Sequence, residues 1–173
     1  MSDEMILLVD QKDNSIGELS KIEVHKKGLL HRAVSVFIFD SNDKILLQKR
    51  SETKYHSANL WSNTACTHPR LDEEPIKAAH RRLYFEMGLS CELKHCFNFI
   101  YKEDLGNGLI EHEYDHVFIG FRNIYPNFNK NEVSEFKYMS IEDLEIDINK
   151  NPKNYTNWFK LCIPKISNFR KKI

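Results

Sequence analysis

The sequence predicts an α+β domain in which helices pack on the faces of a mixed β-sheet. Three observations support this fold class: two strand-like runs around a polar turn, a capped amphipathic helix, and further strand-like runs after that helix. A chain of 173 residues is long enough to bury a core without disulfides. We therefore expect residues 1–173 to form a single domain.

A hairpin is predicted at residues 33–50, where two β-rich runs flank the sequence Asp-Ser-Asn-Asp. A helix is predicted at residues 71–89, because apolar residues recur there at spacings of three and four. Acidic residues and a proline precede this apolar series and Gly88 follows it, which are usual signals at the two ends of a helix.

Three more strands are expected after the helix, at residues 93–101, 114–121 and 136–139. A Gly-Asn-Gly turn separates the first two, and a loop with proline and asparagine precedes the third. The last element is an amphipathic helix expected at residues 154–169, which Pro164 should kink or break.

The composition excludes several classes of protein. Hydrophobic residues make up 41% and charged residues 29%, as in a folded soluble protein rather than a disordered tail. Lys and Arg together number 25, as do Asp and Glu, so we expect neither nucleic-acid nor membrane-surface binding, both of which need an excess of positive charge. No apolar run is long enough for a signal peptide or a membrane span, and the four cysteines lack CxxC spacing. We therefore expect a cytoplasmic protein with reduced thiols.

Histidines and carboxylates occur in a pattern that could bind a metal. His25 and His31 flank the start of the first predicted strand, and His68 follows a cysteine in the sequence SNTACTHP. Glu111 and Glu113 are two residues apart, so a strand would project both carboxylates from one face. Three imidazoles and two carboxylates suit Mn²⁺, Zn²⁺ or Mg²⁺. Since these residues come from three segments, their spacing alone leaves open that they are ordinary exposed or core histidines.

Several basic residues could bind a diphosphate. Arg82 and Glu86 are four residues apart on the predicted helix, and on their own they also fit a surface ion pair. Lys21, Arg50 and Lys54 add positive charge near the histidine segments. The planar guanidinium of arginine binds phosphate oxygens in pairs. Taken singly, each of these residues also fits an ordinary solvated surface.

Four segments extend this pattern in chain order: KIEVHKKGLLHRAVSVFIF, LLQKRSETKYHSANLWSNTACTHPR, AAHRRLYFEMGL and GLIEHEYDHVF. Together they resemble the type 1 isopentenyl-diphosphate isomerases, a branch of the Nudix superfamily. The likeness runs from about Lys21 to Trp158, and it is specific because WSNTACTHP, the spaced glutamates and the upstream histidines occur together. It implies a Nudix-like mixed β-sheet sandwiched by helices. It also implies a divalent-metal-dependent isomerase that interconverts isopentenyl and dimethylallyl diphosphate, in isoprenoid precursor biosynthesis, by protonation and deprotonation of the double bond.

The resemblance assigns a role to each matching position. The metal ligands would be His25, His31, His68, Glu111 and Glu113, with Glu86 holding a second ion, Mg²⁺, that the substrate diphosphate bridges. The diphosphate would contact Lys21, Arg50, Lys54 and Arg82. The catalytic residues would be Glu113 as acid, Tyr101 as its support, Cys66 thiolate as base and Trp158 as an aromatic cap over the carbocation.

The helix within 71–89 also resembles a degenerate Nudix box. Arg82 stands where the hydrolases carry Glu, Phe85 replaces the first Glu of a pair, and Glu86 remains. Fewer carboxylates bind fewer catalytic metals, which favours the isomerase over a Nudix hydrolase that cleaves a nucleoside diphosphate linkage. A third interpretation, a non-enzymatic module that binds proteins, does not account for the metal and diphosphate residues. The expected partner is a small diphosphate, and the chain could be a monomer or a homodimer.

Overall fold

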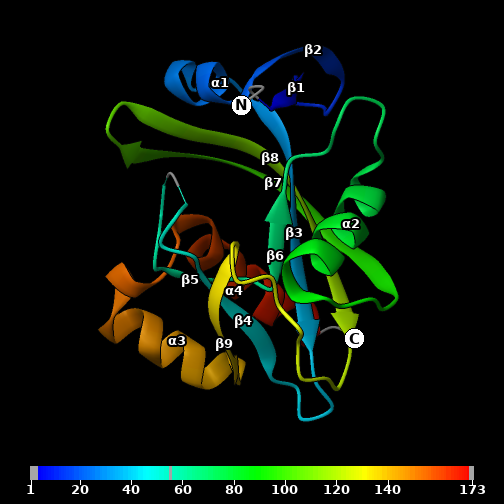
Figure 1. Cartoon of the computed structure of the whole chain (residues 1–173), viewed down its shortest axis with the longest axis vertical. Helices are drawn as coiled ribbons and strands as arrows, with labels where there is room; N and C mark the ends of the chain where they lie inside the picture. Colours follow the sequence, from blue (N-terminus) through cyan, green and yellow to red (C-terminus); the bar gives the residue numbers. More distant parts are fainter. Residues whose placement is uncertain (1–3, 55, 172–173) are drawn as a thin grey trace.

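The computed structural model describes residues 4–54 and 56–171, and in this part of the chain nine strands form one mixed sheet (Figure 1). The strands are β1 (Met5–Val9), β2 (Ser15–Ser20), β3 (His31–Phe39), β4 (Ile45–Arg50), β5 (Trp61–Ser62), β6 (Ala65–Thr67), β7 (Leu93–Gly106), β8 (Leu109–Phe121) and β9 (Val133–Met139). The helices are α1 (Lys21–Lys27), α2 (Pro75–Met87), α3 (Ile141–Lys150) and α4 (Asn157–Arg170), with a short 3₁₀ helix at Pro152–Asn154. The predicted α+β class is confirmed.

Strand β3 lies at the centre of the sheet and is covered on both faces. It pairs in parallel with β8 and antiparallel with β1, β4 and β6. Because side chains alternate along a strand, Phe37 packs in the cluster on the α4 side while Val36 and Ile38 pack in the cluster on the α2 side. Figure 1 shows α2 and α4 on opposite sides of β3, so the sheet is sandwiched by helices.

The polar turn at residues 40–43 is present, but the two strands around it do not form a full hairpin. The carboxylate of Asp40 accepts from the backbone N–H groups of Asn42 and Lys44, which closes the turn. Beyond the pair Phe39 and Ile45, however, β3 and β4 separate. β3 continues beside β8 and β6, and β4 beside β9 and β5, since each finds a longer partner strand elsewhere.

Helix α2 is shorter than the predicted segment 71–89, because its first residue is Pro75 and its cap is Glu74. At the other end Gly88 has φ +64°, and its N–H donates to the carbonyl of Tyr84. A Cβ at this position would lie 2.5 Å from the carbonyl oxygen of Asn127. Gly88 therefore both ends the helix and lets the loop before β9 approach it.

Pro164 does not break the last helix, which was one of the two effects expected of it, and α4 continues through it to Arg170. Pro164 is exposed, while Cys162, Ile163 and Ile166 beside it are buried in the core. Burial of these apolar side chains stabilises the helix by more than the one backbone hydrogen bond that proline removes.

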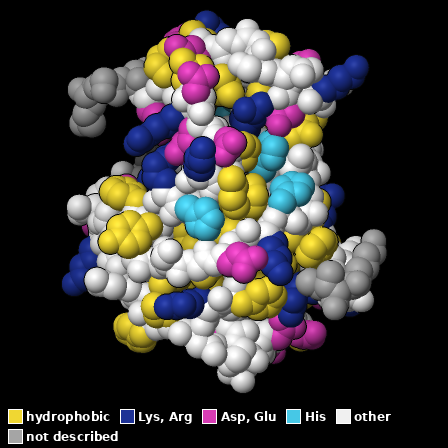
Figure 2. All heavy atoms as spheres, turned by 90° about the vertical axis from the view of Figure 1, so that its right-hand side faces the viewer, with side chains coloured by type: hydrophobic (Ala, Val, Ile, Leu, Met, Phe, Trp, Pro, Cys, Tyr) yellow, Lys and Arg dark blue, Asp and Glu magenta, His cyan; other side chains and the backbone are white. Residues whose placement is uncertain are grey.

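Several elements were not predicted from the sequence. These are the hairpin of β1 and β2, the seven-residue helix α1, and helix α3. Strands β7 and β8 extend beyond 93–101 and 114–121, which places the spaced glutamates inside a strand. None of the described helices has the length and apolar character needed to cross a bilayer. Figure 2 shows acidic and basic side chains interspersed on one face of the molecule, in keeping with the balanced charge.

Replacing Gly88 should destabilise the fold more than replacing another glycine of the same backbone conformation. Gly108 has φ +73° and open space where a Cβ would lie, so Gly108→Ala should cost about 1 kcal/mol for the left-handed backbone alone. Gly88→Ala adds the clash with Asn127 and should cost at least about 1 kcal/mol more. Urea unfolding of both variants measures the difference, and equal losses would show that the contact with Asn127 is unimportant.

Candidate active site

One pocket brings together residues from motifs that are far apart in the sequence. It is lined by Lys21, Arg50, Lys54, Cys66, His68, Arg82, Glu111, Glu113 and Trp158, among others. The remaining residues of the predicted site contact this lining: His25 and His31 lie beside Glu111, Glu86 beside Arg82, and Tyr101 beside Glu113. All thirteen predicted site residues are thus in one place.

The register of the sheet explains much of this convergence. His31, the first residue of β3, is the partner of Glu113 in the parallel ladder with β8. Tyr101 is the partner of Glu113 in the antiparallel ladder with β7, and Cys66 in β6 is opposite Ser35 of β3. A shift by one residue would turn these side chains to the other face of the sheet.

His25 reaches the site through the short helix α1. The side chain of Ser20 accepts from the N–H of Glu23 at the start of the helix, and Gly28 ends it in the left-handed conformation, at φ 60°. The helix holds the imidazole of His25 in a fully buried position beside β8.

A group of four residues has the geometry of a metal site. The ligand atoms of His25, His31, His68 and Glu111 all lie within 4.8 Å of one another, and all four residues are buried. Glu113 borders this group, with Oε1 3.1 Å from Nε2 of His68. We call these five residues the His/Glu cluster.

The hydrogen bonds of the cluster fit a divalent cation. Nδ1 of His31 lies 2.9 Å from the carbonyl oxygen of Leu29, and Nδ1 of His25 lies 2.6 Å from that of Lys21. A carbonyl only accepts, so each Nδ1 carries a proton and Nε2 of each ring faces the cluster. Nε2 of His31 and Oε1 of Glu111 are 3.2 Å apart, and within residues 4–54 and 56–171 neither forms a hydrogen bond. Buried nitrogen and oxygen ligand atoms in this arrangement fit a divalent cation.

Glu113 is placed to carry a proton. The hydroxyl of Tyr101 donates to Oε2 of Glu113 at 2.5 Å, and both residues are buried. Burial, followed by the charges of Glu111 and Asp115, raises the pKa of Glu113 well above its ordinary value. The pair therefore forms an acid in a dry environment.

Cys66 carries a thiol that is also protonated at neutral pH. Burial raises its pKa to about 12, and the charge of Glu86 adds to this effect while Arg50 opposes it. A thiolate formed here would be a strong base.

Trp158 is held in one orientation by a buried polar network. Its indole Nε1 donates to Oδ1 of Asn63 at 3.2 Å, and Nδ2 of Asn63 donates to the carbonyl of Ala65 at 2.7 Å. The guanidinium carbon of Arg50 lies 5.3 Å from the ring centroid of Trp158, so this ring already faces a cation. The ring of His56 meets Trp158 edge to face at 6.0 Å.

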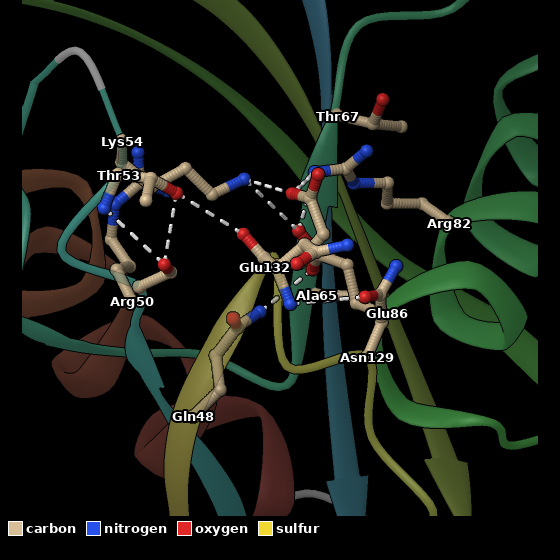
Figure 3. A network of polar contacts seen from close by, with 12 residues as sticks. Gln48, Arg50, Thr53, Lys54, Ala65, Thr67, Arg82, Glu86, Asn129 and Glu132 are labelled. Atoms are coloured by element: carbon tan, nitrogen blue, oxygen red, sulfur yellow. Dashed lines mark hydrogen bonds and ion pairs between the residues drawn. The ribbon is translucent and has the colours of Figure 1, made fainter.

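Glu86 is buried and is oriented by two neighbours (Figure 3). Gln48 donates to its Oε2 at 2.7 Å, and Arg82 donates to its Oε1 at 2.6 Å. The pair of Arg82 and Glu86, which on the sequence alone could lie on the surface, is therefore part of the pocket.

Other residues of the pocket region had no predicted role. Glu132 and His56 line the pocket, and Asn63 supports Trp158. His56 and Asn63 lie in the quoted segment that contains WSNTACTHP, which could have indicated them, whereas Glu132 lies outside every quoted segment and only the fold brings it to the site. His112, which lies between the two glutamates of β8, is 3.0 Å through Nδ1 from the carbonyl of Gly28 and does not line the pocket.

Comparison with known proteins places the chain among enzymes of one kind. The Nudix domain family matches residues 29–159. An isopentenyl-diphosphate Delta-isomerase 2 of Photorhabdus laumondii is 52% identical over 165 residues, which are 95% of this chain and 93% of that protein. A protein of the same name from Aromatoleum aromaticum is 45% identical over 168 residues, which are 97% of this chain and 89% of that protein. The DR0079 protein of Deinococcus radiodurans has the same fold, with a TM-score of 0.77 at 17% identity over 94% of this chain and 98% of that one.

Loss of one cluster ligand should weaken metal binding. Glu111→Ala and His68→Ala should each lower the affinity for the first divalent ion at least roughly tenfold, since a ligand or its support is removed. His112→Ala is the matched control, because this neighbour of Glu111 lies outside the pocket. Elemental analysis after dialysis measures the bound ion. A purified wild-type protein without stoichiometric metal that still acts in excess chelator would contradict the assignment.

Proposed function

The chain belongs to the Nudix superfamily and, within it, to the isopentenyl-diphosphate Delta-isomerases, and on this premise we propose how its pocket interconverts isopentenyl and dimethylallyl diphosphate. The observation that carries the proposal is the meeting of a buried acid, Glu113, and a half-buried thiol, Cys66, in a pocket that also contains an arginine and lysine cluster. The reaction supplies precursors for isoprenoid biosynthesis.

Glu113 is the acid of this proposal. An unactivated alkene is a poor base, so its protonation needs a strong acid that is shielded from water. The raised pKa keeps the proton on Glu113, and Tyr101 donates to the other oxygen of the carboxyl group. Protonation of the terminal carbon of isopentenyl diphosphate yields a tertiary carbocation, and the hydrogen bond from Tyr101 stabilises the carboxylate that remains.

Cys66 is the base that removes a proton from the carbon between the cation and the diphosphate arm. Because its pKa is about 12 in the protein alone, Cys66 has to release its thiol proton to solvent before it can act as the base. Removal of the proton there completes the new double bond, and the diphosphate is unchanged. In this proposal acid and base act on opposite faces of the alkene.

Trp158 stabilises the carbocation between these two steps. The negative face of an indole attracts a cation by about 0.5–2 kcal/mol, and by more when the site is dry. Asn63 holds the ring in the orientation that the pocket needs.

The diphosphate is bound by Lys21, Arg50, Lys54 and Arg82, all of which line the pocket. These contacts place the alkene between acid and base. We propose that Glu86 would hold a Mg²⁺ ion together with the diphosphate, and that the His/Glu cluster would hold Mn²⁺, Zn²⁺ or Mg²⁺. When bound in the cluster, such an ion would supply positive charge that makes the proton of Glu113 more acidic.

Two further features complete the proposal. Helix α1 lies outside the matched residues 29–159 but contributes Lys21 and His25, which supports one domain over residues 1–173. The ends of that range lie outside the described residues.

We place the enzyme in the cytoplasm, as a monomer or homodimer whose partner is a small diphosphate.

The isomerase activity is tested by incubating the protein with isopentenyl diphosphate and Mg²⁺ and recording the methyl proton signals of dimethylallyl diphosphate. Cys66→Ala should lower turnover about 10²–10⁴-fold, as expected for loss of a proton-transfer group, and it should still bind diphosphate. Cys91→Ala is the control, because Cys91 does not line the pocket. Turnover by Cys66→Ala above a tenth of the wild-type value would exclude Cys66 as the base.

A further inference from the structure

Glu132 is an acidic residue in the middle of the positive charges that bind the diphosphate. Its backbone is fixed on both sides, since its N–H donates to the carbonyl of Asn129 at 2.9 Å and its carbonyl accepts from the N–H of Ser51 at 3.0 Å. Its side chain is only 20% exposed and lines the pocket. The carboxylate is therefore placed by the fold and does not point freely into solvent.

Two cations of the diphosphate site converge on this carboxylate. Arg82 donates to Oε2 of Glu132 at 2.6 Å, and the ammonium of Lys54 donates to the same oxygen. Figure 3 shows Lys54 reaching in from the loop after β4 and Arg82 from α2, with Glu132 between them. The same two cations also contact Glu86, Arg82 at 2.6 Å and Lys54 at 3.8 Å.

The two pairs of charges balance. Burial alone would raise the pKa of Glu132, but Arg82 and Lys54 hold it below its ordinary value, so the carboxylate is ionised at neutral pH. Arg82 and Lys54 are thus offset by Glu86 and Glu132 before any ligand arrives. A metal-free diphosphate, which carries several negative charges, gains attraction from two cations there but meets repulsion from two carboxylates at similar range.

For a diphosphate that carries a divalent cation, the balance of attraction and repulsion from these side chains is different. Its net negative charge is smaller, and the carboxylates that repel the free anion attract its cation. This part of the pocket therefore favours the complex of metal and diphosphate over the bare anion.

We propose that Glu132 is a specificity-determining residue that makes the site select metal-bound diphosphate and reject metal-free diphosphate and phosphate. The inference rests on the proposed function in that it takes the pocket to be a diphosphate site. It adds a role for a residue that belongs to none of the recognised motifs. Glu132 needs no contact with the reacting carbons for this role.

Binding of inorganic diphosphate, measured by titration calorimetry in Mg²⁺ and in excess chelator, tests the proposal without using turnover. In the wild type the Mg²⁺ complex should bind at least about tenfold more tightly than the free anion. In Glu132→Gln this preference for the Mg²⁺ complex should fall at least about tenfold. Removal of the negative charge of Glu132 increases the affinity for the metal-free diphosphate more than the affinity for the less negative Mg²⁺ complex. Glu132→Asp, which keeps the charge, should retain most of the preference.

The control is Glu135→Gln, three residues further along. Glu135 pairs with Lys49 at 2.8 Å, its side chain is 58% exposed, and it does not line the pocket. This variant makes the same change in net charge and should keep the wild-type preference. If Glu132→Gln does not fold, as judged by circular dichroism, Glu132→Ala removes the same charge and is measured instead.

Four results would overturn the proposal: an unchanged preference in the variant without the Glu132 charge, equal weakening of both forms of the ligand, an equal effect of Glu135→Gln, or no binding of diphosphate to the wild type. A wild-type protein that binds diphosphate but forms no dimethylallyl product would contradict the proposed isomerase activity instead. The ratio of the two affinities would still decide the role of Glu132.

Discussion

The structure depends on two buried ligand atoms that face each other, Nε2 of His31 and Oε1 of Glu111, 3.2 Å apart. Each is turned toward the other by the fold: Nδ1 of His31 is committed to the carbonyl of Leu29, and Glu111 is fixed in β8. A cation between two such atoms would stabilise this contact. The parallel pairing of β3 with β8 and the short helix α1 thus assemble a buried group of ligand atoms that could hold a metal ion.

Burial also sets the protonation of Glu113 and Cys66, the acid and the base of the proposed mechanism. It raises the pKa of both Glu113 and Cys66, so the protein alone keeps a proton on each. In the proposed mechanism one of them is protonated and the other is not. Positive charge from the arginines of the pocket and from the divalent cations that we propose would act on both groups. In the proposal for Glu132, this residue and Glu86 offset Arg82 and Lys54 until a diphosphate with its own cation binds.

Local patterns predicted part of this architecture. The spacing of apolar residues and the proline and glycine at its ends located α2, and the two-residue spacing of Glu111 and Glu113 placed both in one cluster. The resemblance to a known family then identified the candidate metal ligands and the basic residues that line or support the pocket. Such features can be predicted from the sequence because they are local, or because they are short motifs that occur in a characteristic order along the chain.

Other features depend on contacts that no local pattern records. The strands around the turn at 40–43 separate because β8 and β9 offer longer pairings, and α4 passes through Pro164 because its neighbours are buried. Helix α1 has only seven residues, too few for a clear period. Glu132 reaches Arg82 across fifty residues of sequence, so only the tertiary structure brings this acid to the diphosphate site.

X-ray absorption spectroscopy of the protein loaded with one equivalent of Mn²⁺ or Zn²⁺ tests the central claim most directly, because it reports the atoms bound to the ion. The structure predicts a first shell of nitrogen and oxygen only, with the outer-shell scattering of histidine rings and no sulfur. A shell of water oxygens without imidazole, or one that contains the sulfur of Cys66, would contradict the claim that the fold builds its active site around a cation held by the His/Glu cluster.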